Sequence, residues 1–116
     1  NEMKETADPV SDSRFYRGKI LNSDVDYFKF ALSAPSLLYV NFFSYSTNAD
    51  VKVDLYDISD KLLVSNVSTN GQLLSFPVGL STGDYYIKLS QAGDIDQNNY
   101  YHYSEFLGRQ PSWNPV

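Results

Sequence analysis

Short stretches in which apolar and polar residues alternate follow one another along most of this chain. Within 26–32, every second residue from position 28 onward is Phe, Phe or Leu. The same period of two recurs in 51–56 and in 85–90, and it turns one face of an extended strand inward. The stretch 36–43 is apolar on both sides, which predicts a central strand of a sandwich.

Turn residues separate these stretches at intervals of about 8–12 residues, and no helical window lies between them. The clearest signal is Asn70-Gly71, between 61–67 and 72–78, because both residues tolerate positive φ in a hairpin. Together the pattern predicts an all-β fold, a jelly-roll-like antiparallel β-sandwich of about eight strands, the last near 100–106. Further turn signals lie at 34–36, 81–83 and 92–94.

The chain has 116 residues, which argues for one domain. We expect a polar N-terminal segment at 1–13, a sandwich at 14–106 and a C-terminal tail at 107–116. The chain opens at Asn1 with neither Met nor a signal peptide, so we expect a mature or trimmed piece of a longer precursor.

Composition excludes several classes of partner. The net charge is −5, the pI is near 4.6 and the nine Lys and Arg residues are scattered singly, so we expect no nucleic-acid partner. No apolar run approaches the roughly 20 residues of a membrane span. The chain has no cysteine, and therefore neither disulfides nor thiolate chemistry.

Three motifs occur in a fixed order. They are D-x-D-Y-F within 18–30, L-Y-D at the end of 49–57 and G-x-Y-Y-I within 80–89. This order resembles the bacterial pre-peptidase C-terminal domain family, which is related to the collagen-binding domains of clostridial collagenases, over about 5–106. The resemblance implies a small, secreted or cell-surface, calcium-associated bacterial β-sandwich appended to an exported protein.

The function implied by this resemblance is that of a noncatalytic accessory domain of a secreted hydrolase or peptidase, which aids secretion, stability or substrate contact. The alternative is a ligand-binding module for polysaccharide or fibrous protein that uses exposed tyrosines. A third alternative is a structural spacer. We expect a monomer whose partners are an extracellular polymer or the catalytic domain of the parent enzyme.

Acidic residues near the D-x-D-Y-F motif form a candidate calcium site. Asp24 and Asp26 are two positions apart on one strand, so their carboxylates point the same way, and Ca²⁺ prefers such oxygen ligands. An acidic strand that folds back with Glu5 and Asp8 would complete the shell. The resemblance implies an E-x-N-D ligand segment here, in which Ala7 replaces the Asn. In the alternative interpretation Asp24 and Asp26 only flank a strand.

A second acidic cluster has the carboxylate spacing of an EF-hand loop, with Asp94, Asp96, Asn98 and Glu105 at positions one, three, five and twelve. Asn99 stands where that loop needs its Gly, and the flanks are Tyr-rich strands. We therefore interpret the cluster as the turn before the last strand.

Three further acids lie in or beside the second motif. Asp54, Asp57 and Asp60 are predicted to be solvated strand edges and a turn, with Asp60 in the place of a Gly that is usual in the resembled family.

The tyrosines are the candidate ligand-binding residues, because aromatic planes on an outer sheet face can stack on a polymer. Ordinary cross-strand packing is the alternative. Collagen-binding relatives have tyrosines where this chain has Ser90 and Ala92, which argues against collagen as the ligand. The candidates are Tyr27, Tyr86, Tyr101 and Tyr103, and Tyr39 and Tyr56 belong to the same outward set.

Catalysis has little support in the sequence. His102 is the sole histidine, and a single histidine in an aromatic strand is more often structural than a general base. Since no nucleophile motif accompanies it, we predict that the chain is not an enzyme.

Overall fold

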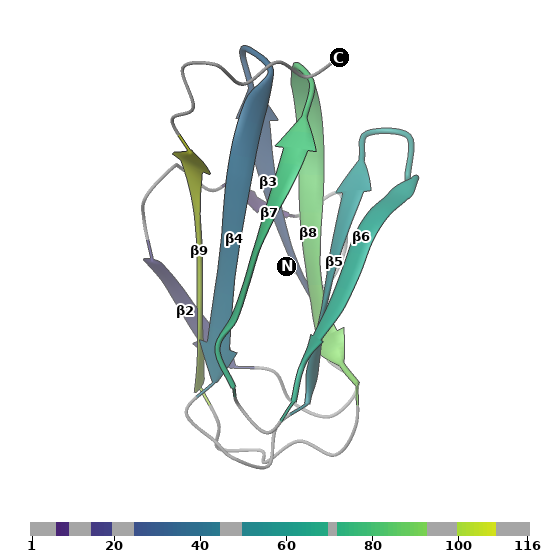
Figure 1. Ribbon diagram of the computed structural model, residues 1–116. Coiled ribbons are helices and arrows are strands. Elements are labelled where there is room, and N and C mark those ends of the chain that lie inside the picture. The colour runs from purple at the N-terminus through teal and green to yellow at the C-terminus, as the bar shows by residue number, and fades with distance from the viewer. Residues whose placement is uncertain are drawn as a thin grey trace.

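Two β-sheets pack against each other and enclose the hydrophobic core (Figure 1). The computed structural model describes residues 7–9, 15–19, 25–44, 50–69, 72–92 and 100–108. Nine strands and no helix lie in those ranges, one more strand than the eight or so that the sequence predicts. The predicted all-β sandwich is confirmed, and the described part of the chain contains no apolar helix of membrane-crossing length.

The larger sheet has five strands in the order β1-β3-β8-β5-β6. Its pairs are antiparallel except for the two-residue β1, which runs parallel to β3. Each of the alternating stretches in the sequence forms one of its strands. The bounds are β1 Asp8–Pro9, β3 Val25–Leu32, β8 Gly83–Gln91, β5 Val51–Asp57 and β6 Leu62–Ser68.

The smaller sheet has four antiparallel strands in the order β2-β9-β4-β7. The stretch that is apolar on both sides forms β4, which lies between β9 and β7, so its predicted central position is confirmed. The bounds are β2 Phe15–Lys19, β9 Tyr100–Gly108, β4 Ser36–Ser44 and β7 Leu74–Leu80. The last strand thus ends two residues beyond the predicted 106.

The core forms where the inward residues of the two sheets meet. The period of two is visible in the burial of β3, β5 and β8, where the inward residues at every second position are shielded from solvent. Burial of such apolar side chains is the main source of stability in a chain without disulfides. The buried residues include Phe28, Phe30, Leu32, Val51, Val53, Leu55, Tyr85, Ile87 and Leu89 from the larger sheet and Leu38, Val40, Phe42 and Leu80 from the smaller one.

The turn between β7 and β8 is tied to the core by Tyr85. Its ring stacks on Phe30 with centroids 5.6 Å apart, and its hydroxyl donates a hydrogen bond of 2.8 Å to the carbonyl oxygen of Ser81. Gly83 begins β8 with a φ of 152°, a conformation that residues with a Cβ rarely adopt. The predicted turn at 81–83 is therefore confirmed, and Gly83 is required by its backbone conformation.

We predict that Ile87→Ala lowers the free energy of unfolding by about 2–5 kcal/mol, because truncation of a fully buried residue in the central strand leaves a cavity. Val67→Ala is the matched control: this edge-strand residue is 46% exposed, and its truncation changes stability by less than about 0.5 kcal/mol. Urea unfolding of both variants measures the difference. Equal losses for the two would contradict the assigned core.

Candidate ligand-binding site

The outer face of the larger sheet carries the residues that alternate with the core. Tyr27 of β3, Tyr86 of β8 and Tyr56 of β5 all lie on this face. Tyr56 is directly opposite Tyr86 in the β5–β8 register, whereas Tyr27 is opposite Lys88, which lies two residues along β8 from Tyr86. Three neighbouring strands thus bring three tyrosines into one area.

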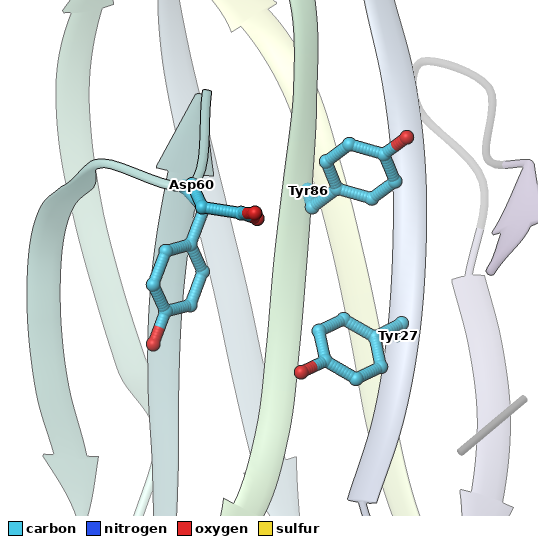
Figure 2. A pocket seen from close by; sticks show the side chains of 4 residues that line it. Tyr27, Asp60 and Tyr86 are labelled. Atoms are coloured by element: carbon cyan, nitrogen blue, oxygen red, sulfur yellow. The ribbon is translucent and has the colours of Figure 1, made fainter. Parts of the chain in front are cut away.

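These tyrosines line a pocket together with Asp60 (Figure 2). Tyr27 projects from β3 toward β8, and the Asp60 carboxylate points from the β5–β6 connection toward Tyr86. The pocket volume is about 180 Å³. Pockets that bury a whole drug-sized ligand have roughly 300–1,000 Å³, so this one is smaller than such a pocket.

A tight turn between β5 and β6 holds Asp60 in place. The Oδ1 atom of Asp57 accepts hydrogen bonds from the backbone N–H groups of Ser59, at 2.8 Å, and Lys61, at 3.0 Å. Asp60 has a φ of 67°, in the left-handed region that favours glycine. The prediction that Asp57 and Asp60 belong to a turn, with Asp60 in the place of a glycine, is confirmed.

The prediction for Asp54 is wrong. Its side chain faces outward but is only 1% exposed, so it is not a solvated strand edge. The reason is the strand order: β5 lies between β8 and β6, whose outward residues Lys88 and Ser65 flank Asp54 on both sides. Its Oδ2 atom is 3.6 Å from Nζ of Lys52, and its Oδ1 atom has no hydrogen-bond partner among the described residues.

Lys88 lies between Asp54 and Tyr27 in the strand register. Its Nζ atom is 6.0 Å from the ring centroid of Tyr27, at the outer limit of a cation–π contact. The ammonium group is therefore near the aromatic ring of the pocket and not bonded to the buried carboxylate on its other side.

The pKa of Tyr56 is raised above its ordinary value of 10.0. Burial is the largest cause, because it disfavours the phenolate, and the negative charge of Asp54 adds to it. The positive charge of Lys88 acts in the opposite direction. Tyr56 is consequently a neutral phenol, able to donate a hydrogen bond to a ligand, throughout the physiological pH range.

The structure separates the four tyrosines that the sequence suggests as ligand contacts. Tyr27 and Tyr86 share the pocket, whereas Tyr101 and Tyr103 belong to β9 in the other sheet. Asp60 lines the pocket although the sequence indicated only a turn at that position. The period of two places Tyr56 on the outer face, but it does not show that a turn residue reaches the same pocket.

No protein-family model matches the chain, and no curated protein matches it either. In structure it is similar to the pre-peptidase C-terminal domain of collagenase from Bacillus anthracis, with a TM-score of 0.71 and 16% sequence identity. The match covers 90% of this chain and 99% of that domain. The chain has a pre-peptidase C-terminal-like fold. The resemblance drawn from the three sequence motifs is thus confirmed in the fold.

Two further solved structures are similar to this chain. The Yersinia pseudotuberculosis-derived mitogen has a TM-score of 0.61 at 16% identity and is matched over 85% of this chain and 90% of its own. The carbohydrate-binding module CBM36, in complex with calcium and xylotriose, has a TM-score of 0.44 at 20% identity, over 78% of this chain and 85% of its own.

The predicted calcium ligands of this pre-peptidase C-terminal-like fold are only partly within the described residues. Asp8 is in β1 opposite Phe28, so its segment runs beside β3, and Asp26 lies two residues before Phe28 on the same strand. Glu5, Asp24 and the cluster at 94–98 lie outside the described ranges. Within those ranges no group of three or more metal-binding side chains occurs.

We predict that Tyr56→Phe reduces the loss of stability at alkaline pH. Because the folded state holds the phenolic proton more tightly than the unfolded chain, the contribution of Tyr56 is complete below pH 10 and is lost as pH rises through its raised pKa. Urea unfolding between pH 9 and pH 12 measures the effect. In Asp54→Asn the pKa of Tyr56 moves back toward its ordinary value, as phenolate absorbance will show. The prediction fails if wild type and Tyr56→Phe lose stability in parallel.

Proposed function

We propose that this chain is a noncatalytic accessory module of an exported bacterial protein and that it binds an extracellular polysaccharide through the outer face of the larger sheet. The observation that carries the proposal is the convergence of Tyr27, Tyr56, Tyr86 and Asp60 on one pocket. Of the roles considered for an accessory domain, substrate contact is the one that this geometry supports.

A sugar chain fits the chemistry of the pocket. Tyrosine rings offer flat apolar surfaces for the faces of sugar rings, and their hydroxyl groups, with the Asp60 carboxylate, can exchange hydrogen bonds with sugar hydroxyls. The small volume of the pocket suits one unit of a longer polymer. Lys29 and Lys88 lie on the same face as Asp54 and Asp60, so neither sign of charge dominates, and an uncharged polysaccharide is favoured.

The absence of catalysis is part of the proposal. Glycoside hydrolysis ordinarily needs two carboxyl groups on either side of the bond that is cleaved, whereas the described residues that line this pocket include one. His102 is in β9 of the other sheet. The fold is similar to that of a domain from a collagenase, and this likeness supports the proposal that the parent protein here is a secreted hydrolase or peptidase.

We predict that the protein is retained on at least one of insoluble cellulose, xylan or chitin and that Tyr86→Ala weakens the retention about tenfold, as loss of a central aromatic contact does. Tyr39→Ala is the matched control, because Tyr39 is a half-buried tyrosine in β4 of the other sheet. Depletion binding isotherms measure both. If no polysaccharide retains the wild-type protein, or if both variants lose equally, this face is not the binding site.

We expect no retention of the same protein on triple-helical collagen peptides at micromolar concentration. Ser90 and Ala92 stand where collagen-binding relatives have tyrosines, and Ser90 is in β8 on the face that carries Tyr86. An aromatic platform for collagen is therefore incomplete. Saturable binding to collagen that Tyr86→Ala weakens would replace polysaccharide with a fibrous protein as the ligand of this face.

We also propose that calcium stabilises the fold through Glu5, Asp8, Asp24 and Asp26. The support is the parallel pairing of β1 with β3, which runs the segment of Asp8 alongside the strand of Asp26. Carboxylate oxygens are the ligands that Ca²⁺ prefers, and a bound ion would tie the N-terminal segment to the sheet.

We predict that Ca²⁺ at a hundredfold excess over its dissociation constant adds about 2.7 kcal/mol to the free energy of unfolding, visible as a rise in Tm. Asp26→Ala should abolish the rise, whereas Asp96→Ala, in the second acidic cluster, should leave it intact. Thermal unfolding with Ca²⁺ and with a chelator tests this. The reverse pattern would move the site to the second cluster.

A further inference from the structure

The buried carboxylate of Asp54 is the least satisfied group in the described part of the chain. It is 1% exposed, its Oδ2 atom lies 3.6 Å from Nζ of Lys52, and its Oδ1 atom is buried with no hydrogen-bond partner among the described residues. Buried polar atoms are nearly always paired, because an unpaired one has lost its water without replacement. A structure that keeps such an atom open needs an explanation.

The natural donor for this atom is directly beside it. Lys88 is opposite Asp54 in the β5–β8 register, and side chains opposite each other on one face have Cβ atoms about 4.5–5.5 Å apart. The long, flexible stem of a lysine can reach that far. In the described structure, however, the ammonium group is on the other side, 6.0 Å from the ring centroid of Tyr27.

Lys88 therefore has two alternative partners. One is the ring face of Tyr27, which lines the pocket, and the other is the open oxygen of Asp54. The Tyr27 side chain projects from β3 toward β8, the strand that carries Lys88 (Figure 2). The Nζ atom of Lys88 is accordingly 6.0 Å from the centroid of the Tyr27 ring. A ligand that stacks on this part of Tyr27 competes with the ammonium group for the same surface.

We propose that Lys88 is a specificity-determining residue of the pocket: a ligand ring that stacks on Tyr27 displaces the Lys88 ammonium, which then pairs with Oδ1 of Asp54. This inference rests on the proposed function, because it uses the same pocket. In the bound state the open oxygen gains a charged donor, so part of the free energy of binding comes from the pair that forms beneath the ligand.

The displacement also restricts the ligand. A cationic ligand would face an ammonium group that is already present near the ring, whereas an uncharged ring with an apolar face needs only to move that group aside. Lys52 stays near Oδ2 of Asp54, so the carboxylate would have one lysine at each oxygen. The pocket therefore binds uncharged sugar rings more tightly than amino sugars with free amines.

The first experiment needs no ligand. Tyr27→Leu removes the aromatic face but keeps an apolar side chain, so Lys88 should move to Asp54. We expect a slowly exchanging ammonium signal of Lys88 in ¹H–¹⁵N NMR spectra of Tyr27→Leu, and its disappearance in Tyr27→Leu/Asp54→Asn. A Tyr27→Leu protein without this signal, or with a signal that survives Asp54→Asn, overturns the proposal.

The second experiment measures coupling in ligand binding. Cellohexaose, xylohexaose and N-acetyl-chitohexaose are each titrated by calorimetry into wild type, Asp54→Asn, Lys88→Met and the double variant. We expect Asp54→Asn to weaken binding on the order of fivefold when Lys88 is present and to have no further effect in Lys88→Met. Equal effects of Asp54→Asn in both backgrounds overturn the proposal but leave the proposed function standing.

The two proposals fail in different ways. If none of the three hexasaccharides binds, and no insoluble polysaccharide retains the protein, the proposed function is wrong and the part of the inference that concerns ligands falls with it. The NMR experiment still decides whether Lys88 exchanges between Tyr27 and Asp54. If the hexasaccharides bind and the effects of Asp54→Asn and Lys88→Met on affinity are additive, only the proposed role of Lys88 is wrong.

Discussion

The register of the three central strands of the larger sheet sets the rest of this structure. In one inward row, Phe28 of β3 lies opposite Ile87 of β8, which lies opposite Leu55 of β5. All three are buried, so a slip of one residue in any strand would turn apolar side chains to solvent and polar ones to the core. Hydrophobic burial therefore fixes the register, and the register determines which side chains are neighbours on the opposite face of the sheet.

The pairing of the outward residues across β3, β8 and β5 follows directly from this inward row. Because inward and outward residues alternate, the register that pairs Phe28 with Ile87 also pairs Tyr27 with Lys88 and Lys88 with Asp54. The same register sets Tyr86 opposite Tyr56. The pocket, its nearby lysine and its buried carboxylate are thus positioned by contacts on the other side of the sheet, which gives them a rigid support.

The chemistry of the pocket reflects where these residues sit in the sheet. Asp54 is shielded because β5 has neighbours on both sides, and its charge in turn helps to raise the pKa of Tyr56. Asp60 reaches the same pocket from a turn that Asp57 closes with two hydrogen bonds to backbone N–H groups. The pocket is built from one turn and three strands and carries charges of both signs, and these features support the proposal that it contacts part of a polymer.

The period of two in the sequence was enough to define the three central strands of the larger sheet, β3, β5 and β8, and the residues of each that enter the core. Together with the turn signals it also predicted the all-β class. It was enough because a strand with one buried face is recognised by the alternation of apolar and polar residues, which is a local property of the sequence. Three motifs in order also identified the pre-peptidase C-terminal-like fold, which the structural likeness to the Bacillus anthracis domain confirms. Asp60 was likewise recognisable as a turn residue from its position after L-Y-D.

Only the tertiary structure decided which outward residues share a surface. Tyr27, Tyr86, Tyr101 and Tyr103 look equivalent in the sequence, but the strand order assigns the first two to one sheet and the last two to the other. Asp54 looked solvated because its own strand is polar on that side. It is buried because β8, about thirty residues further along the chain, pairs with β5 and covers it. Alternation fixes the face on which a side chain lies, whereas its exposure and its partners depend on strands that are distant in the sequence.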